Sequence, residues 1–215
     1  MTYYKVLDEH RNPIHGGIGR WAYRKWMPHI DNIEACRRGY HVCREHDLVL
    51  WLGPTIWEVE IKGDVIELHD KVVASDARLV RKVQTWNKRT ARLFACDCAE
   101  HVLNYADTKH VGILKNTIRV ARRYANGKAT DEERAAAWAA WGAREAAGAA
   151  ALESSWAAFS AASLEASWGA FSASRAARKA ARGASRAARK AAREAEHNWQ
   201  TQRLVEYING KRGAK

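Results

Sequence analysis

Short runs of alternating hydrophobic and polar residues, separated by glycine and proline, occupy the first 85 positions of the chain. In residues 55–62, Trp57, Val59 and Ile61 fall on one face because they are spaced two residues apart. A period of two residues is typical of a half-buried β-strand. The pattern predicts a strand here and a small mixed domain over residues 1–85.

The other segments of this region carry weaker patterns. Gly63 and Asp64 predict a turn directly after the strand, because both residue types favour tight turns. Gly53 and Pro54 are expected to end a preceding helix. The expected elements are strands at residues 3–7 and 39–43, a short helix at 44–52, a returning hairpin strand at 65–68 and a segment at 72–83 that fits a strand or a helix.

The hydrophobic period becomes helical in the second part of the chain. Helices are expected at residues 89–105 and 113–124, the second ending before an Asn-Gly pair. Thr130 and Glu133 have the spacing of a capping box, which predicts the start of a further helix. Residues 86–215 are therefore expected to form an alanine-rich helical domain, and the fold class of the whole chain is α+β.

Two tandem repeats follow within this helical part. Residues 152–160 recur at 164–172, and residues 175–185 recur at 186–196. The eleven-residue step of the second repeat nearly closes three helical turns and keeps one face in register. The twelve-residue step of the first repeat rotates the face by about a third of a turn. This mismatch favours a break within residues 131–197 over one uninterrupted helix.

The second repeat carries a basic stripe. On a helical wheel, eight cations fall within an arc of roughly 120°. They are Arg175, Arg178, Lys179, Arg182, Arg186, Arg189, Lys190 and Arg193. Like charges at this spacing repel one another, which favours contact with an anion over a purely solvated face, although solvation alone stays open. If all eight met duplex DNA, the affinity would fall by about four orders of magnitude between 50 and 200 mM salt.

The net charge of the chain points in the same direction. The 215 residues carry a formal charge of +12, with a pI of about 9.8. Such a charge favours an anionic partner: a nucleotide signal, a nucleic acid or an acidic protein. No apolar run is long enough to cross a bilayer, and the first residues lack the layout of a signal peptide. We expect a cytoplasmic protein with no membrane partner.

Cysteine and histidine form two groups in the sequence. The first contains Cys36, His41, Cys43 and His46, and the second contains Cys96, Cys98 and His101. Zinc accepts these residue types, but the spacings match no common zinc finger. Reduced cysteines in a core are the favoured interpretation, so no metal and no cofactor are expected.

A possible site in the first domain combines four residues of two predicted strands. They are Tyr40, His41, Glu58 and Glu60. A Gly-aromatic-His strand with a glutamate-bearing strand is similar to ADP-ribosyltransferase-like folds. No nucleophile elbow, phosphate loop or metalloprotease motif accompanies it. The non-enzymatic interpretation is favoured, and an ADP-ribosyltransferase-like enzyme is kept as an alternative.

Two stretches resemble known families. Residues 36–43, with Trp51, Trp57 and the run 70–73, resemble an N-terminal domain found in phage and prophage proteins. Residues 77–103 resemble a helical family of immunity proteins, whose members continue with alanine- and tryptophan-rich helices. The resemblance implies a protein of a bacterial host that binds and neutralises something, and it carries over no catalytic residues.

Three functions are therefore expected from the sequence. The first is a phage-type binding protein, of an immunity or anti-defence kind, that engages a host or rival factor or sequesters an anionic nucleotide signal through its basic helices. The second is a nucleic-acid-binding protein that uses the stripe at residues 175–193 on phosphates without reading bases. The third is the enzyme alternative in the first domain. Small-residue helix faces also make a homo-oligomer plausible.

Overall fold

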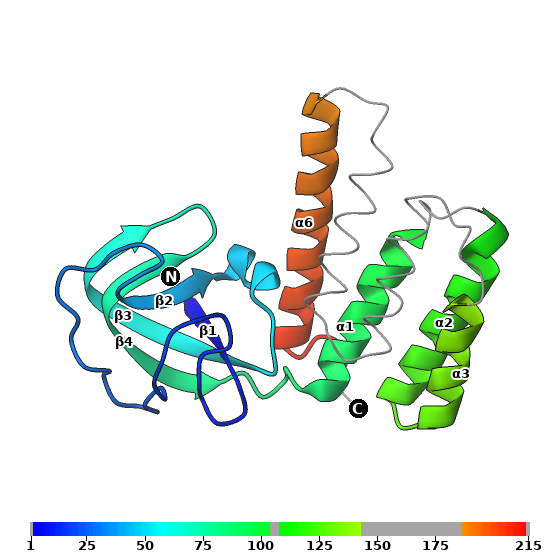
Figure 1. The fold of residues 1–215 in the computed structure, drawn as a ribbon, viewed down its shortest axis with the longest axis horizontal. Helices are drawn as coiled ribbons and strands as arrows, with labels where there is room; N and C mark the ends of the chain where they lie inside the picture. Colours follow the sequence, from blue (N-terminus) through cyan, green and yellow to red (C-terminus); the bar gives the residue numbers. More distant parts are fainter. Residues whose placement is uncertain (1, 104–107, 143–185, 214–215) are drawn as a thin grey trace. The chain divides into compact units, whose positions relative to one another are not determined.

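The chain is mixed α/β, with antiparallel strands followed by helices. The structure, a computed structural model, describes residues 2–103, 108–142 and 186–213 (Figure 1). Contacts divide the chain into two units, Met1–Asn87 and Lys88–Lys215. The observed boundary lies two residues after the predicted one.

Four strands of the N-terminal unit close into a small barrel. The strands are β1 (Tyr3–Leu7), β2 (Tyr40–Arg44), β3 (Thr55–Glu67) and β4 (Val72–Lys82), in the order β1-β2-β4-β3 (Figure 1). All four neighbouring pairs are antiparallel. Because β1 pairs with both β2 and β3, the first strand along the chain closes the barrel. The predicted strands at 3–7, 39–43 and 55–62 are confirmed with small changes in their ends.

The predicted turn at Gly63 and Asp64 is wrong, because β3 continues through these residues. The ladder between β3 and β4 instead shifts register between Lys62 and Val65. Gly63 has a φ of +74°, and a Cβ at this position would lie 2.1 Å from the Oγ of Ser75. This bulge bends a long strand, which is how a small sheet curves enough to close. The segment expected to return as a hairpin strand is the end of β3.

Two other predictions in this unit are refined. The ambiguous segment at 72–83 is the strand β4, and its first six residues are buried. The short helix is a 3₁₀ helix, η1 (Glu45–Leu50), and its backbone turns at Trp51. The core lies within the barrel, where Trp21 and Trp57 pack with aliphatic residues. Its other buried members are Leu7, Val42, Val59, Val72, Ala77 and Leu79.

The described helices of the C-terminal unit are α1 (Lys88–His101), α2 (Thr108–Ala125), α3 (Asp131–Gly142) and α6 (Arg186–Ile208). Helix α1 contacts α2 and α6, and α2 contacts α3. Within these ranges, no helix is both long and apolar enough to cross a membrane.

The capping signals of this unit are confirmed. The backbone N–H of Thr130 donates to the Glu133 carboxylate at 2.8 Å, and the N–H of Glu133 donates to the Thr130 hydroxyl at 3.2 Å. Gly127, with a φ of +66°, follows the end of α2 as expected. Residues 143–185 lie outside the described residues, so the alanine-rich bundle, the first repeat and the break between repeats stay predictions.

Candidate functional site

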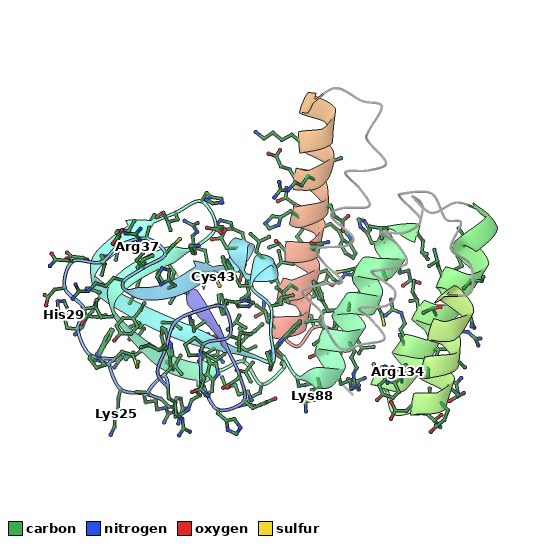
Figure 2. All side chains as sticks on the ribbon, in the orientation of Figure 1. Lys25, His29, Arg37, Cys43, Lys88 and Arg134 are labelled. Carbon is green, nitrogen blue, oxygen red and sulfur yellow. The ribbon has the colours of Figure 1, made fainter. Side chains whose placement is uncertain are left out.

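A pocket of about 410 Å³ opens in the N-terminal unit. One side is formed by strands β1 and β2, and the other by the long loop that connects them. Trp51 and Lys71 complete the lining from the segments after η1 and before β4. Figure 2 shows Cys43, a buried lining residue on β2, well inside this unit and Arg37 at its outer edge. A closed barrel thus supplies a rigid wall, and a loop supplies the mouth.

The charge of the lining has one sign. Four cations line the pocket: Lys5, Arg37, Arg38 and Lys71. No aspartate or glutamate is among the lining residues, all of which the structure describes. Arg37 pairs with Glu34 at 3.2 Å, and Lys71 lies 3.9 Å from an oxygen of Asp70. Within the described part of the chain, Lys5 and Arg38 have no ion pair, so the pocket keeps a net positive potential.

Lys5 is the most unusual of these cations. It lies between Tyr3 and Leu7, and alternation along β1 places all three on the face that carries the barrel core. Its ammonium donates to the backbone oxygen of His41 at 2.8 Å and lies 5.1 Å from the centre of the Trp21 ring. Burial lowers the pKa of Lys5 to about 8. A charge at this position is costly unless an anion accompanies it.

An aromatic residue forms another part of the lining. Trp51 is half-buried, and its indole N–H donates to the backbone oxygen of Asp70 at 2.9 Å. The His15 ring meets it edge to face, with centroids 5.5 Å apart, and donates from Nε2 to the Trp51 backbone oxygen at 2.8 Å. The ammonium of Lys71 lies 5.0 Å from the Trp51 ring centre. The indole is therefore held in place beside a cation.

A glycine-rich loop borders the pocket mouth. Gly16, Gly17 and Gly19 have φ values of +88°, +91° and +87°. Ile18, among them, is 99% exposed and lines the pocket. The backbone N–H groups of residues 16–19 make no hydrogen bond within the described chain. Such amides are free to donate to an anion that approaches the loop.

Two of the predicted site residues line this pocket, but their polar atoms are already engaged. The backbone N–H of Cys36 donates to Nε2 of His41 at 3.1 Å, and Nδ1 of His41 lies 3.1 Å from the Gly39 oxygen. Burial, helped by the charges of Lys5 and Lys71, lowers the pKa of His41 against the opposing effect of the hydrogen bond to Gly39. The Tyr40 hydroxyl donates to the Pro28 oxygen at 2.5 Å. Both side chains hold the loop against β2.

The two predicted glutamates lie elsewhere on the barrel. Glu58 binds Arg81 through two hydrogen bonds of 2.7 and 2.6 Å, and Glu60 binds Arg78 at 2.7 Å. These are cross-strand pairs between β3 and β4, and neither glutamate lines the pocket. The structure does not bring them together with His41. Sequence spacing could not show this, because β2 and β3 are not neighbours in the barrel.

The cysteines separate into one exposed and three buried residues. Cys36 is exposed and lines the pocket. Burial raises the pKa of Cys43 and of Cys96 to about 12, and it raises that of Cys98 as well. Among the described residues, no three of the metal-binding types lie close enough to hold an ion. Because burial raises their pKa values far above neutral pH, the buried thiols are poor nucleophiles.

The basic stripe lies mostly outside the described residues. This applies to Arg175, Arg178, Lys179 and Arg182, and to the side chains of Arg186 and Arg189 in α6. Lys190 and Arg193 are exposed on α6, and Lys190 pairs with Glu194 at 3.6 Å. The stripe as an anion-binding surface stays a prediction.

Sequence reasoning missed Lys5, Arg38 and Lys71, because they are far apart in the chain and share no motif. The one available signal was a lysine at a core-facing position of a predicted strand. Comparison of the chain with protein-family models, with curated proteins and with solved structures found no match. The resemblance to phage and immunity-protein families consequently stays a prediction, and the site is interpreted from its own chemistry.

Proposed function

We propose that this protein is a non-enzymatic binding protein that holds a small anionic ligand in the pocket of its N-terminal barrel. The observation that carries the proposal is Lys5, a desolvated ammonium without a carboxylate partner in the described chain. The proposal keeps the expected sequestration of an anion but moves its site from the basic helices to the barrel.

The energetic cost of burying the Lys5 ammonium favours a bound anion. A buried cation is normally paired with a carboxylate, because desolvation otherwise disfavours its charged form. Here the acceptor is the backbone oxygen of His41, and Lys5 lines a pocket together with further cations. An anionic ligand would supply the missing charge. A stability-only role would be served as well by an apolar side chain at this position.

The pocket size supports a small ligand. Its volume of about 410 Å³ lies near the lower end of the range of ligand pockets, roughly 300 to 1,000 Å³. A pocket of this size encloses a single small molecule and leaves no room for a duplex. The family resemblance implies a protein that binds and neutralises something, and sequestration of such a molecule needs nothing more than tight binding.

The occupied side chains support binding over catalysis. A general acid or base must have a free polar atom within reach of the substrate. Both ring nitrogens of His41 and the hydroxyl of Tyr40 already have partners within the loop. The Glu58 carboxylate already accepts two hydrogen bonds from Arg81 on another part of the barrel. The ADP-ribosyltransferase-like alternative therefore has no support from the described contacts.

Isothermal titration with inorganic pyrophosphate tests the proposal. We expect saturable binding at one site per chain, weakened at least about tenfold by Lys5→Met. Lys25→Met is the matched control because it removes the same charge from an exposed position of the same unit, outside the pocket lining (Figure 2). The control should bind normally. Equal weakening in both variants would mean general electrostatic attraction and would overturn the proposal.

Cys36 provides an independent reporter for the same site. Since the other three thiols of the chain are buried, iodoacetamide should modify Cys36 first. Pyrophosphate should slow this modification in the natural chain but not in Lys5→Met. Unchanged modification at saturating pyrophosphate would place the bound anion outside the pocket. The same experiment distinguishes binding in the pocket from binding at the basic stripe, because phosphates bound to α6 would leave Cys36 unprotected.

A further inference from the structure

We infer that the anionic ligand is a nucleoside phosphate, whose phosphates face Lys5 and the glycine-rich loop and whose base stacks on Trp51. This inference rests on the proposed function and adds the ligand class. Its basis is the combination, in one pocket, of unpaired cations, free backbone amides and a fixed aromatic ring.

The phosphate end is defined by two kinds of donor. Lys5 and Arg38 supply positive charge without a carboxylate competitor among the described residues. The loop of residues 16–19 supplies backbone N–H groups that make no internal hydrogen bond. Glycines with positive φ allow consecutive amides to point toward one anion, as in many phosphate-binding loops. A simple carboxylate has too few acceptor oxygens to use both sets of donors.

The base end is defined by Trp51. Its ring is held by the hydrogen bond to Asp70 and by the edge of His15, so stacking on it requires little reordering. Stacking of a base on an aromatic side chain tolerates every base, because each one has a π-face. The ammonium of Lys71 lies over the ring, so the base would stack on the opposite face of the indole. A phosphate ion alone would leave this half-buried surface unused.

Ile18 adds an apolar contact at the mouth. Ile18 is fully exposed at the pocket mouth, where a bound ring or sugar would cover part of it. The neighbouring Gly17 and Gly19 can adopt backbone angles that other residues avoid. The same loop thus combines donors for the phosphates with an apolar side chain for the nucleoside.

Titration with ADP, GDP, CDP, UDP, pyrophosphate and adenosine tests the inference. At least one nucleoside diphosphate should bind about tenfold more tightly than pyrophosphate, and adenosine should bind at least about a hundredfold more weakly than that nucleotide. If pyrophosphate binds and no nucleotide binds more tightly, the ligand class is wrong while the proposed function stands. If neither pyrophosphate nor any nucleotide binds, both proposals fail.

Two substitutions of Trp51 separate stacking from folding. Trp51→Leu should weaken nucleotide binding about tenfold and pyrophosphate binding much less, and the retained pyrophosphate binding also shows that the pocket is folded. Trp51→Tyr keeps a ring and should recover most of the nucleotide affinity. Trp26→Leu is the matched control, because Trp26 belongs to the same unit and does not line the pocket. Equal nucleotide affinity in Trp51→Leu and Trp26→Leu would overturn the inference.

Discussion

Buried charge is balanced in a network of the C-terminal unit and unbalanced in the pocket of the N-terminal unit. In the C-terminal unit the carboxylate of the buried Asp97 forms ion pairs with Arg122 at 2.7 Å, Arg203 at 3.4 Å and Arg212 at 3.6 Å. It also accepts a hydrogen bond from the Tyr207 hydroxyl at 3.1 Å. Further carboxylates pair with the same arginines. Burial, the largest single influence, would lower the pKa of Arg122, but the neighbouring acidic groups, Asp97 first among them, together outweigh it and raise the pKa.

The N-terminal pocket has the cations without the carboxylates. Burial there dominates and lowers the pKa of Lys5 to about 8. The presence or absence of internal charge balance distinguishes charges that stabilise the fold of this protein from charges that bind a ligand. A network whose charges balance internally joins α1, α2 and α6, whereas a set of like charges around a pocket is balanced only when a ligand enters.

Removing the carboxylate at the centre of the balanced network should have the largest effect. Asp97→Asn leaves the arginines around it without their shared partner, and we expect the free energy of unfolding to fall by about 3–5 kcal/mol. Chemical denaturation measures this change. Anion binding at the pocket should be unaffected in conditions where the variant is folded.

An exposed pair of the same unit serves as the control for Asp97. Glu194→Gln removes the exposed partner of Lys190 on α6, and its expected effect is below about 1 kcal/mol. Similar losses in both variants would show that burial does not distinguish the two pairs, and the comparison between the units would fail.

Replacing Lys5, the buried charge without a counter-charge, should raise the free energy of unfolding, whereas replacing Asp97 should lower it. Lys5→Met removes a buried ammonium that has only a backbone acceptor, so the ligand-free protein should become more stable by about 1–2 kcal/mol at pH 7. The same variant should lose most of its pyrophosphate affinity. Greater stability together with weaker binding is the result expected for a binding residue, and destabilisation would indicate a structural lysine.

The lowered pKa of Lys5 also makes the stability of the chain depend on pH. The pKa of Lys5 is about 8 in the folded chain, below its ordinary value near 10.5, so the unfolded state binds more protons between these values. Stability of the natural chain should therefore rise relative to Lys5→Met as the pH increases from about 8 to about 10.5. Parallel denaturation curves of the two proteins across this range measure the difference, and a constant difference would contradict it.

Ligand affinity should change with pH in the other direction. An anion binds the protonated form of Lys5, so above about pH 8 the dissociation constant should rise, approaching tenfold per pH unit. Titration calorimetry with pyrophosphate at several pH values tests this. Lys5→Arg, which stays charged, is the reference that corrects for titration of the ligand itself. Identical pH profiles for the natural chain and Lys5→Arg would show that Lys5 does not bind the anion.

Arg38, an exposed cation of the pocket without an ion pair among the described residues, should give the smallest effect. Arg38→Met removes a charge that is already hydrated, so the free energy of unfolding should change by less than about 0.5 kcal/mol. Pyrophosphate affinity should fall several-fold, and less so at high salt because exposed charges are screened. An unchanged affinity at low salt would restrict the site to the buried part of the pocket.

Local patterns predicted much of the fold. The alternation in β3 and the capping box of Thr130 and Glu133 depend on neighbouring residues, so they could be found in the sequence and are confirmed. The turn at Gly63 could not be judged locally. A glycine with positive φ serves a turn or a bulge equally well, and pairing with β4 determined which one formed.

The candidate site was predicted less well, for a physical reason. Tyr40 and His41 do line the pocket, but the hydrogen bonds that occupy them come from a loop whose path the sequence does not reveal. Glu58 and Glu60 were grouped with them on the assumption that their strands are neighbours. The barrel order places β1 and β4 between β2 and β3, and cross-strand arginines take both carboxylates.

Periodicity, capping and charge are properties of short stretches or of sums, so the sequence predicted several strands and helices, such as β1, β2 and the start of α3, and the strongly positive charge of the chain. The places where a charge lacks a counter-charge depend on the three-dimensional fold. Lys5 and Arg38 are 33 positions apart, and closure of the barrel and the course of its long loop bring them to one pocket. A desolvated charge is a property of everything around it, so it can be recognised only when those surroundings are known.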